Sequence, residues 1–217
     1  MKLRCLATSL FALVAACARS PLPPLVSLPA AAEADAAARC QQAFPPQPWR
    51  ATHTILATLP LGYNGALLGV LAATAEGLHA VLLSPEGITL FEAVHKRGGS
   101  GGLAIQRAVP PFDRSDFALA LLADVGAAFL PPAGEPEDIG RAAGGATVCR
   151  WAPTRHEATE VELGQSGPAR IRTFRGANVT RRIELAGVPQ GGFFPHVRLT
   201  VPGAGGYTLD MQLVDRE

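Results

Sequence analysis

The sequence has few aromatic residues, no strongly charged region, no cluster of metal-binding residues and, beyond its start, no long apolar run. Aromatic residues make up 6% of the 217 residues against 48% hydrophobic residues overall, so Ala, Leu and Val must supply most of the core. The 19 basic and 18 acidic residues form neither a basic field for nucleic acid nor an acidic tail. The five histidines are scattered, and none has zinc-site spacing to a cysteine. These absences exclude a nucleic-acid-binding surface and a zinc site, and the length suits one substantial domain.

The beginning of the chain has the composition of a secretory signal. Lys2 and Arg4 precede an uncharged stretch, Cys5 to Val14, which is well below the roughly 20 apolar residues of a spanning helix. Small residues then precede Cys17, and Val14-Ala15-Ala16-Cys17 resembles the bacterial lipobox. The resemblance implies that residues 1–16 are removed and that Cys17 becomes the acylated first residue. The alternative is an ordinary signal peptide cleaved nearby.

Two cysteines remain in the mature chain, Cys40 and Cys149. An even number of cysteines in an exported protein is typical of a disulfide, because the compartment is oxidising. The alternative is two unpaired thiols, one on a mobile segment and one buried.

Residues 17–48 are rich in Pro and Ala, which predicts a semi-extended tether behind the lipid anchor. Ala30 to Gln42 has helix-forming composition and follows Pro29, so a short helix is expected there. Pro45-Pro46-Gln47-Pro48 ends this segment, because consecutive prolines cannot continue a helix. Residues 49–217 are expected to form the folded domain.

Strand patterns follow one another closely from Trp49 onward, separated by turn residues. About eleven strands with hairpin-length connections predict a mainly antiparallel, curved sheet. Their residue ranges are 52–59, 66–74, 78–83, 88–94, 103–109, 147–152, 158–163, 169–174, 179–185, 197–201 and 207–214.

One segment in the middle of the chain departs from this pattern. Asp113-Arg114-Ser115-Asp116 can begin a helix, and the apolar residues Phe117, Leu121, Val125 and Ala128 recur at helical spacing. Leu122 and Phe129 widen this apolar stripe, which ends before two prolines. This helix is expected to cover an apolar face of the sheet.

The range 66–74 is apolar on both faces, with Leu68 and Val70 among its large residues. One interpretation is a central strand with the helix on one side. The other is a wall between the core and an apolar cavity, in which Leu68 and Val70 would line the cavity.

These features together resemble the LolA/LolB lipoprotein-carrier fold, and more closely the uncharacterised LolB-like outer-membrane lipoproteins of Gram-negative bacteria. The specific motifs are Val81-Leu82-Leu83-Ser84-Pro85-Glu86-Gly87-Ile88-Thr89-Leu90-Phe91 and Phe117-Ala118-Leu119-Ala120-Leu121-Leu122-Ala123-Asp124. The resemblance spans residues 49–214. It implies an unclosed half-barrel, lidded by helix and loop, whose apolar interior accepts acyl chains of lipids or lipoproteins.

The resemblance also implies a place and a set of partners. LolB has an exposed apolar residue on a protruding loop, and Leu59 and Leu61 occupy a similar turn here, although they fit an ordinary hairpin equally well. A periplasmic carrier protein is an expected partner. Ala18 follows Cys17 where Asp would commonly retain a lipoprotein in the inner membrane, which favours the periplasmic face of the outer membrane.

No catalytic residues, metal or cofactor are expected beyond a covalent lipid such as palmitate on Cys17. Gly98-Gly99-Ser100-Gly101-Gly102 formally matches the esterase nucleophile elbow, but that elbow needs a helix directly after it and residues 103–109 predict a strand. The alternative to a carrier is a structural envelope lipoprotein whose barrel is filled by its own side chains. The basic group that contains Arg170, Arg172, Arg175, Arg181 and Arg182 fits an ion-paired sheet face or a contact with lipid phosphates.

Overall fold

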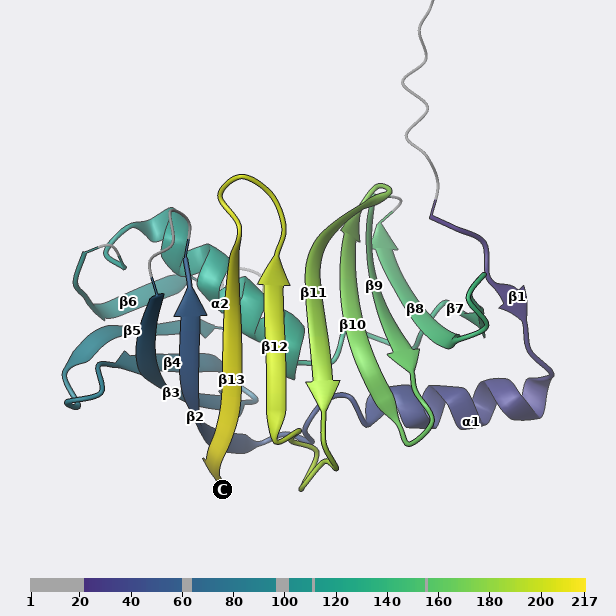
Figure 1. Ribbon diagram of the computed structural model, residues 1–217, viewed down its shortest axis with the longest axis horizontal. Coiled ribbons are helices and arrows are strands. Elements are labelled where there is room, and N and C mark those ends of the chain that lie inside the picture. Colours follow the sequence, from purple (N-terminus) through teal and green to yellow (C-terminus); the bar gives the residue numbers. More distant parts are fainter. Residues whose placement is uncertain (1–21, 60–63, 97–101, 111, 155) are drawn as a thin grey trace, which may run out of the picture.

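A computed structural model describes residues 22–59, 64–96, 102–110, 112–154 and 156–217. Within these residues, thirteen strands form one antiparallel sheet in the order β1-β7-β8-β9-β10-β11-β12-β13-β2-β3-β4-β5-β6, which leaves β1 and β6 at its two edges (Figure 1). The strands are β1 (Val26–Ser27), β2 (Trp49–Thr58), β3 (Asn64–Thr74), β4 (Gly77–Leu83), β5 (Thr89–Lys96), β6 (Leu103–Ala108), β7 (Asp138–Arg141), β8 (Thr147–Thr154), β9 (Glu157–Leu163), β10 (Pro168–Arg175), β11 (Asn178–Ala186), β12 (His196–Val201) and β13 (Tyr207–Arg216). The expected antiparallel half-barrel, open rather than closed, is confirmed.

All eleven expected strands are present. The two additional strands, β1 and β7, contain two and four residues and pair with each other at one edge of the sheet. Such short segments are too brief to show an alternation of apolar and polar residues, so sequence patterns do not reveal them. The last strand, β13, pairs with β2 and thereby joins the two halves of the sheet.

Helix α2 (Ser115–Phe129) runs behind β12 and β13 in Figure 1, contacts β4 and β6, and shares one apolar core with residues of β2 and β3. Its buried residues recur at helical spacing, because one side of the helix faces the core throughout. The apolar residues among them are Ala118, Leu121, Leu122, Val125, Ala128 and Phe129. No side-chain hydrogen bond caps its beginning at Arg114, and it ends at Leu130, before Pro131-Pro132. The expected covering helix is therefore present.

Helix α1 (Ala30–Gln41) packs against β7, β8 and β9 and buries Ala36 and Cys40, which are four residues apart. The short helix expected at 30–42 is present, but the surrounding segment is not a free tether from residue 22 onward. β1 pairs with β7, and Phe44 after the helix is 5% exposed in the same core. The Ala-rich composition that suggested a tether also suits a helix with a small-residue face, which can lie close to a sheet. The folded body therefore begins before residue 49.

Candidate functional site

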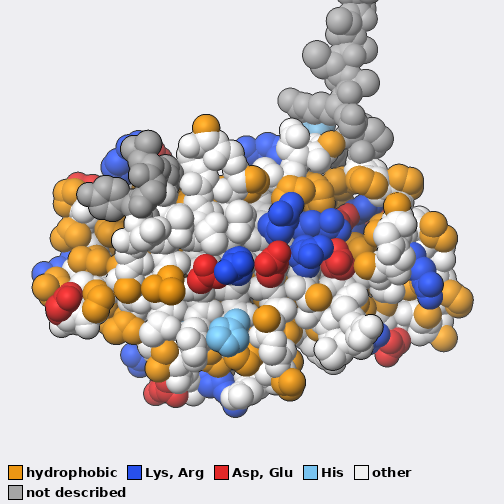
Figure 2. All heavy atoms as spheres, viewed as in Figure 1, with side chains coloured by type: hydrophobic (Ala, Val, Ile, Leu, Met, Phe, Trp, Pro, Cys, Tyr) orange, Lys and Arg blue, Asp and Glu red, His pale blue; other side chains and the backbone are white. Residues whose placement is uncertain are grey.

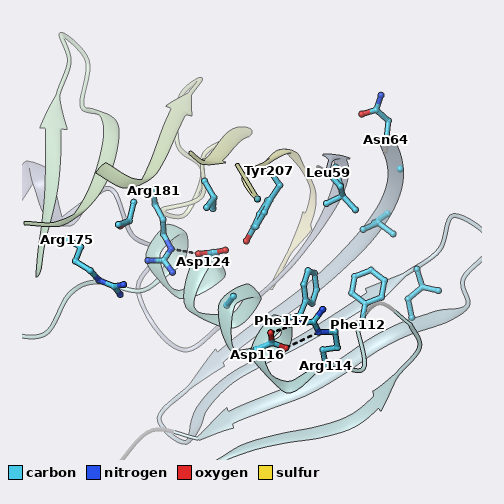
Figure 3. Close-up of a pocket in the computed structure, with 18 residues that line it drawn as sticks. Leu59, Asn64, Phe112, Arg114, Asp116, Phe117, Asp124, Arg175, Arg181 and Tyr207 are labelled. Carbon is cyan, nitrogen blue, oxygen red and sulfur yellow. Dashed lines mark hydrogen bonds and ion pairs between the residues drawn. The ribbon is translucent and has the colours of Figure 1, made fainter. Parts of the chain in front are cut away.

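A cavity of about 980 Å³ opens between the first half of α2 and the ends of several strands (Figure 3). Its apolar side is formed by Leu59, Leu67, Phe112, Phe117 and Tyr207. These side chains come from strands of both halves of the sheet, from the segment before α2 and from α2 itself. The cavity therefore exists only when these elements are packed together in the folded protein. Its volume lies at the upper end of the range of small-molecule sites in proteins.

A narrower pocket of about 60 Å³ continues the opening beneath α2. Sheet residues such as Ile55, Leu71 and Leu82 face Leu121 and Val125 of the helix across it. Six residues line both spaces, and these are Ala57, Leu59, Leu67, Phe112, Phe117 and Tyr207. The interior is therefore reached through the mouth, and its surface is apolar.

Three residues of the expected lid lie where the helical stripe placed them. Phe117 lines the mouth and the inner pocket, while Leu121 and Val125 line the inner pocket alone. Phe129 does not line either space. It lies at the end of α2 in an aromatic cluster, with its ring centroid 6.0 Å from that of Trp49 and 5.2 Å from that of His53.

The face of β3 that lines the cavity is the opposite of the one expected. Leu67 and Leu71 line the cavity, whereas Leu68 and Val70 are half-buried on the outer face of the sheet. Side chains alternate along a strand, so a strand that is apolar on both faces does not reveal which set is inside. Gly69 lies between the two lining leucines, and a Cβ there would stand 2.7 Å from Cδ1 of Ile55. The absence of a side chain at Gly69 thus makes room for Ile55 in the cavity wall.

Asp124 and Arg181 form an ion pair at the cavity that was not expected. Nε of Arg181, on β11, donates a hydrogen bond to the carboxylate of Asp124, on α2. Asp124 is 2% exposed, and burial raises the pKa of its carboxyl group despite the neighbouring guanidinium. The sequence held a signal, because Asp124 lies on the apolar side of the helix and Arg181 lies on the same face of its strand as the buried Ile183 and Leu185. Opposite charges on the inward faces of a helix and a strand indicate that the two side chains form an ion pair.

The remaining arginines of the basic group are mostly paired on the outer face, where Figure 2 shows a band of basic and acidic side chains. Arg172 contacts Glu160 at 3.0 Å and Glu162 at 3.4 Å, and Arg170 contacts Glu162 at 3.3 Å. Arg150 also binds Glu160, at 2.6 Å, and this pair is almost fully buried. These contacts fit the ion-paired sheet face better than a free basic surface.

Two of the residues expected to act at the membrane, Cys17 and Leu61, lie outside the described residues. Leu59 is described and lines both parts of the cavity, so its side chain belongs to the apolar interior.

A disulfide joins Cys40 of α1 to Cys149 of β8, with an S–S distance of 2.10 Å. The two cysteines are 109 residues apart in the sequence and both are fully buried. The bond lies far from the cavity and attaches α1 to the sheet. Its role in this arrangement is structural.

The described part of the chain lacks two features, a cluster of metal-binding residues and a helix that could span a membrane. No group of three or more His, Cys, Asp or Glu residues within it could hold a metal ion. No helix within it is sufficiently long and apolar to cross a bilayer.

Comparison with known proteins gives matches by structure only. No family model matches the sequence, and no curated protein matches it. The structure is similar to a LolA superfamily protein from Nitrosomonas europaea, with a TM-score of 0.50 and 7% identity over 85% of this chain and 92% of that chain. The chain has a LolA-like fold.

Two other solved structures have comparable coverage. An outer membrane lipoprotein-sorting protein domain from Vibrio parahaemolyticus matches with a TM-score of 0.48 and 11% identity, over 85% of this chain and 89% of that chain. A DUF1329 family protein from Desulfovibrio piger matches with a TM-score of 0.49 and 8% identity, over 88% of this chain and 93% of that chain. At these identities the similarity concerns the fold alone.

Proposed function

We propose that this protein binds an acyl chain of a lipid or lipoprotein in the cavity beneath α2. The observation that supports this proposal is the apolar pocket that continues the mouth between Phe117 and Tyr207 into the interior. Each methylene group moved from water into such a pocket gains about 0.8 kcal/mol, so a partly enclosed chain can be retained without any chemical reaction. The proposed role is therefore binding and transfer, as in a LolB-like carrier or receptor of the cell envelope.

The proposed anchor at Cys17 would place the cavity at the membrane. Five residues span at most about 17 Å when fully extended, so Leu22 would lie within that distance of an acylated Cys17. In Figure 1 the described chain begins at the upper edge of the sheet, the edge that also carries the β10–β11 turn and the β12–β13 loop. Arg175 and Gly205 from these two connections line the mouth. The opening would consequently face the bilayer, and the outer membrane is the proposed location.

Displacement of a fluorescent fatty acid tests this proposal. The protein used is the full chain with Cys17→Ser, which cannot be acylated and so carries no lipid of its own. Saturable binding is expected, and Ala120→Trp should weaken it about tenfold or more, because Ala120 lines the mouth and its side chain is exposed there. Leu119→Trp is the matched control, since Leu119 is 49% exposed and does not line the cavity.

Absence of saturable binding would favour the alternative, a structural envelope lipoprotein whose interior is filled by side chains. Equal binding by the Ala120→Trp and Leu119→Trp variants would show that the ligand lies somewhere other than the cavity.

A further inference from the structure

Charge and apolar surface are separated within the cavity. Figure 3 shows Arg175 and Arg181 on one side of the opening and Leu59, Phe112 and Phe117 on the other. One further charged pair, Arg114 with Asp116, lies on the apolar side, but its two side chains bind each other at 2.8 Å. Arg175 and Arg181 thus supply the arginine donors of the opposite side, which is formed by β10 and β11.

Arg181 has one edge of its guanidinium engaged and the other open. Nε binds Asp124, whereas Nη1 and Nη2 have no hydrogen-bond partner among the described residues. The side chain is 26% exposed while the carboxylate behind it is 3% exposed, so the helix side is dry and the opposite edge faces the opening. A planar guanidinium fixed in this way can present two donors to an anionic group.

Arg175 is available for the same purpose. It lies at the end of β10 and contacts Glu157 at 3.6 Å, with 76% and 55% of the two side chains exposed. An exposed pair at this distance contributes little, so the arginine can turn toward a ligand at little cost.

A second cavity adjoins this side of the mouth. It has a volume of about 860 Å³ and lies between the β8–β9 and β10–β11 turns. Arg175 and Thr180 line both cavities, and His156 and Asn178 add polar groups to the second. The second cavity is also lined by Glu157, so the apolar interior continues into a polar groove at the edge of the sheet, and Arg175 lies where the two meet.

We propose that the Arg175–Arg181 side of the mouth binds an anionic headgroup, a carboxylate or a phosphate, whose acyl chain lies along the apolar side of the same cavity, toward the pocket beneath α2. This inference rests on the proposed function and narrows its ligand to anionic amphiphiles. An uncharged chain of the same length would lie along the same apolar side but offer no anionic group to Arg181 and Arg175.

Competition among single-chain ligands tests the inference. Dodecanoate, dodecyl phosphate and dodecanol are compared as competitors of the fluorescent probe on the full-length Cys17→Ser protein, the two anions below their micelle-forming concentrations and dodecanol below its solubility limit. The two anions are expected to displace it at about tenfold lower concentration than dodecanol, as one charge-assisted hydrogen bond provides. Of the two, the stronger ligand indicates whether the headgroup is a phosphate or a carboxylate.

A triple variant removes the positive charge without leaving a buried carboxylate alone. Arg175→Gln, Arg181→Gln and Asp124→Asn together should bring the anions to within about threefold of dodecanol, with dodecanol itself unaffected. Arg182→Gln is the matched control, because Arg182 is exposed and the adjacent residue on the opposite face of the same strand. It should keep the preference for anions.

The outcomes separate the two proposals. Equal displacement by dodecanol and dodecanoate in the Cys17→Ser protein overturns the headgroup inference and leaves acyl-chain binding intact. Retention of the preference by the triple variant also overturns it. Failure of all three ligands to displace the probe contradicts the proposed function itself.

Discussion

His53 makes the stability of this protein depend on pH in a defined direction. The side chain lies on the inner face of β2, 1% exposed, between the rings of Phe129 and Phe193 at centroid distances of 5.2 and 6.4 Å. Neither ring nitrogen has a hydrogen-bond partner among the described residues. Burial without a partner disfavours the charged imidazolium and lowers the pKa of His53 from 6.5 to about 4.

The direction of the pH effect on stability follows from the pH at which the unfolded and the folded chain each bind a proton at His53. As pH falls below 6.5, the unfolded chain takes up a proton at His53 while the folded chain does not until about pH 4. The free energy of unfolding therefore decreases across this interval, by about 2 kcal/mol at pH 5 and about 3.4 kcal/mol once both states are protonated. Asp124 acts in the opposite direction, because its raised pKa lets the folded state take up a proton earlier than the unfolded state.

Urea denaturation of wild type and His53→Leu between pH 7.5 and pH 4 measures this effect. The variant should be close to wild type at pH 7.5, since an apolar side chain replaces a buried group without a partner, and it should lose much less stability on acidification. His196→Leu, on an exposed position of β12, should keep the wild-type pH dependence. If His53→Leu and wild type lose stability in parallel between pH 6.5 and pH 4, the assignment to His53 is wrong.

Three further predictions concern the disulfide, the ion pair and the anchor. The double variant Cys40→Ala/Cys149→Ala should lose about 4–5 kcal/mol in urea denaturation, because the bridge closes a loop over a sequence separation of 109, and an unchanged midpoint would mean that no bridge forms. Asp124→Ala should cost about 2–4 kcal/mol, below the full cost for a buried pair because Arg181 is 26% exposed, whereas Asp116→Ala on the exposed pair should leave the urea midpoint nearly unchanged. Cys17→Ala should release the protein from the membrane fraction, and continued association would show an anchor other than acylation.

Much of the fold could be predicted from local patterns. Alternating residues in β13 and the stripe on α2 identified these elements, because period 2 and period 3.6 are properties of short stretches of chain. The packing of α1 could not be predicted in this way. The composition of residues 30–42 predicts a helix, but an Ala-rich helix can stay within a tether or pack closely on a sheet, and only the contact with β7–β9 distinguishes the two.

The candidate site was predictable on the helix and ambiguous on the sheet. Phe117, Leu121 and Val125 follow from the spacing along α2. Leu68 and Val70 were assigned to the wall in place of Leu67 and Leu71, because β3 is apolar on both faces. The opposite charges of Asp124 and Arg181 are visible in the sequence, but their meeting depends on how α2 crosses the sheet.

The sequence by itself determined the strands, the covering helix and the antiparallel, open character of the sheet, because these depend on side-chain periodicity and short turns between neighbours. It also holds the lipobox-like segment that ends at Cys17. Only the tertiary structure decided which face of β3 is inside, that residues 30–44 belong to the folded body, and that a charged side adjoins an apolar cavity. These features arise from contacts between residues far apart in the chain. The periodicity of a short stretch of sequence does not specify which distant residues it will contact.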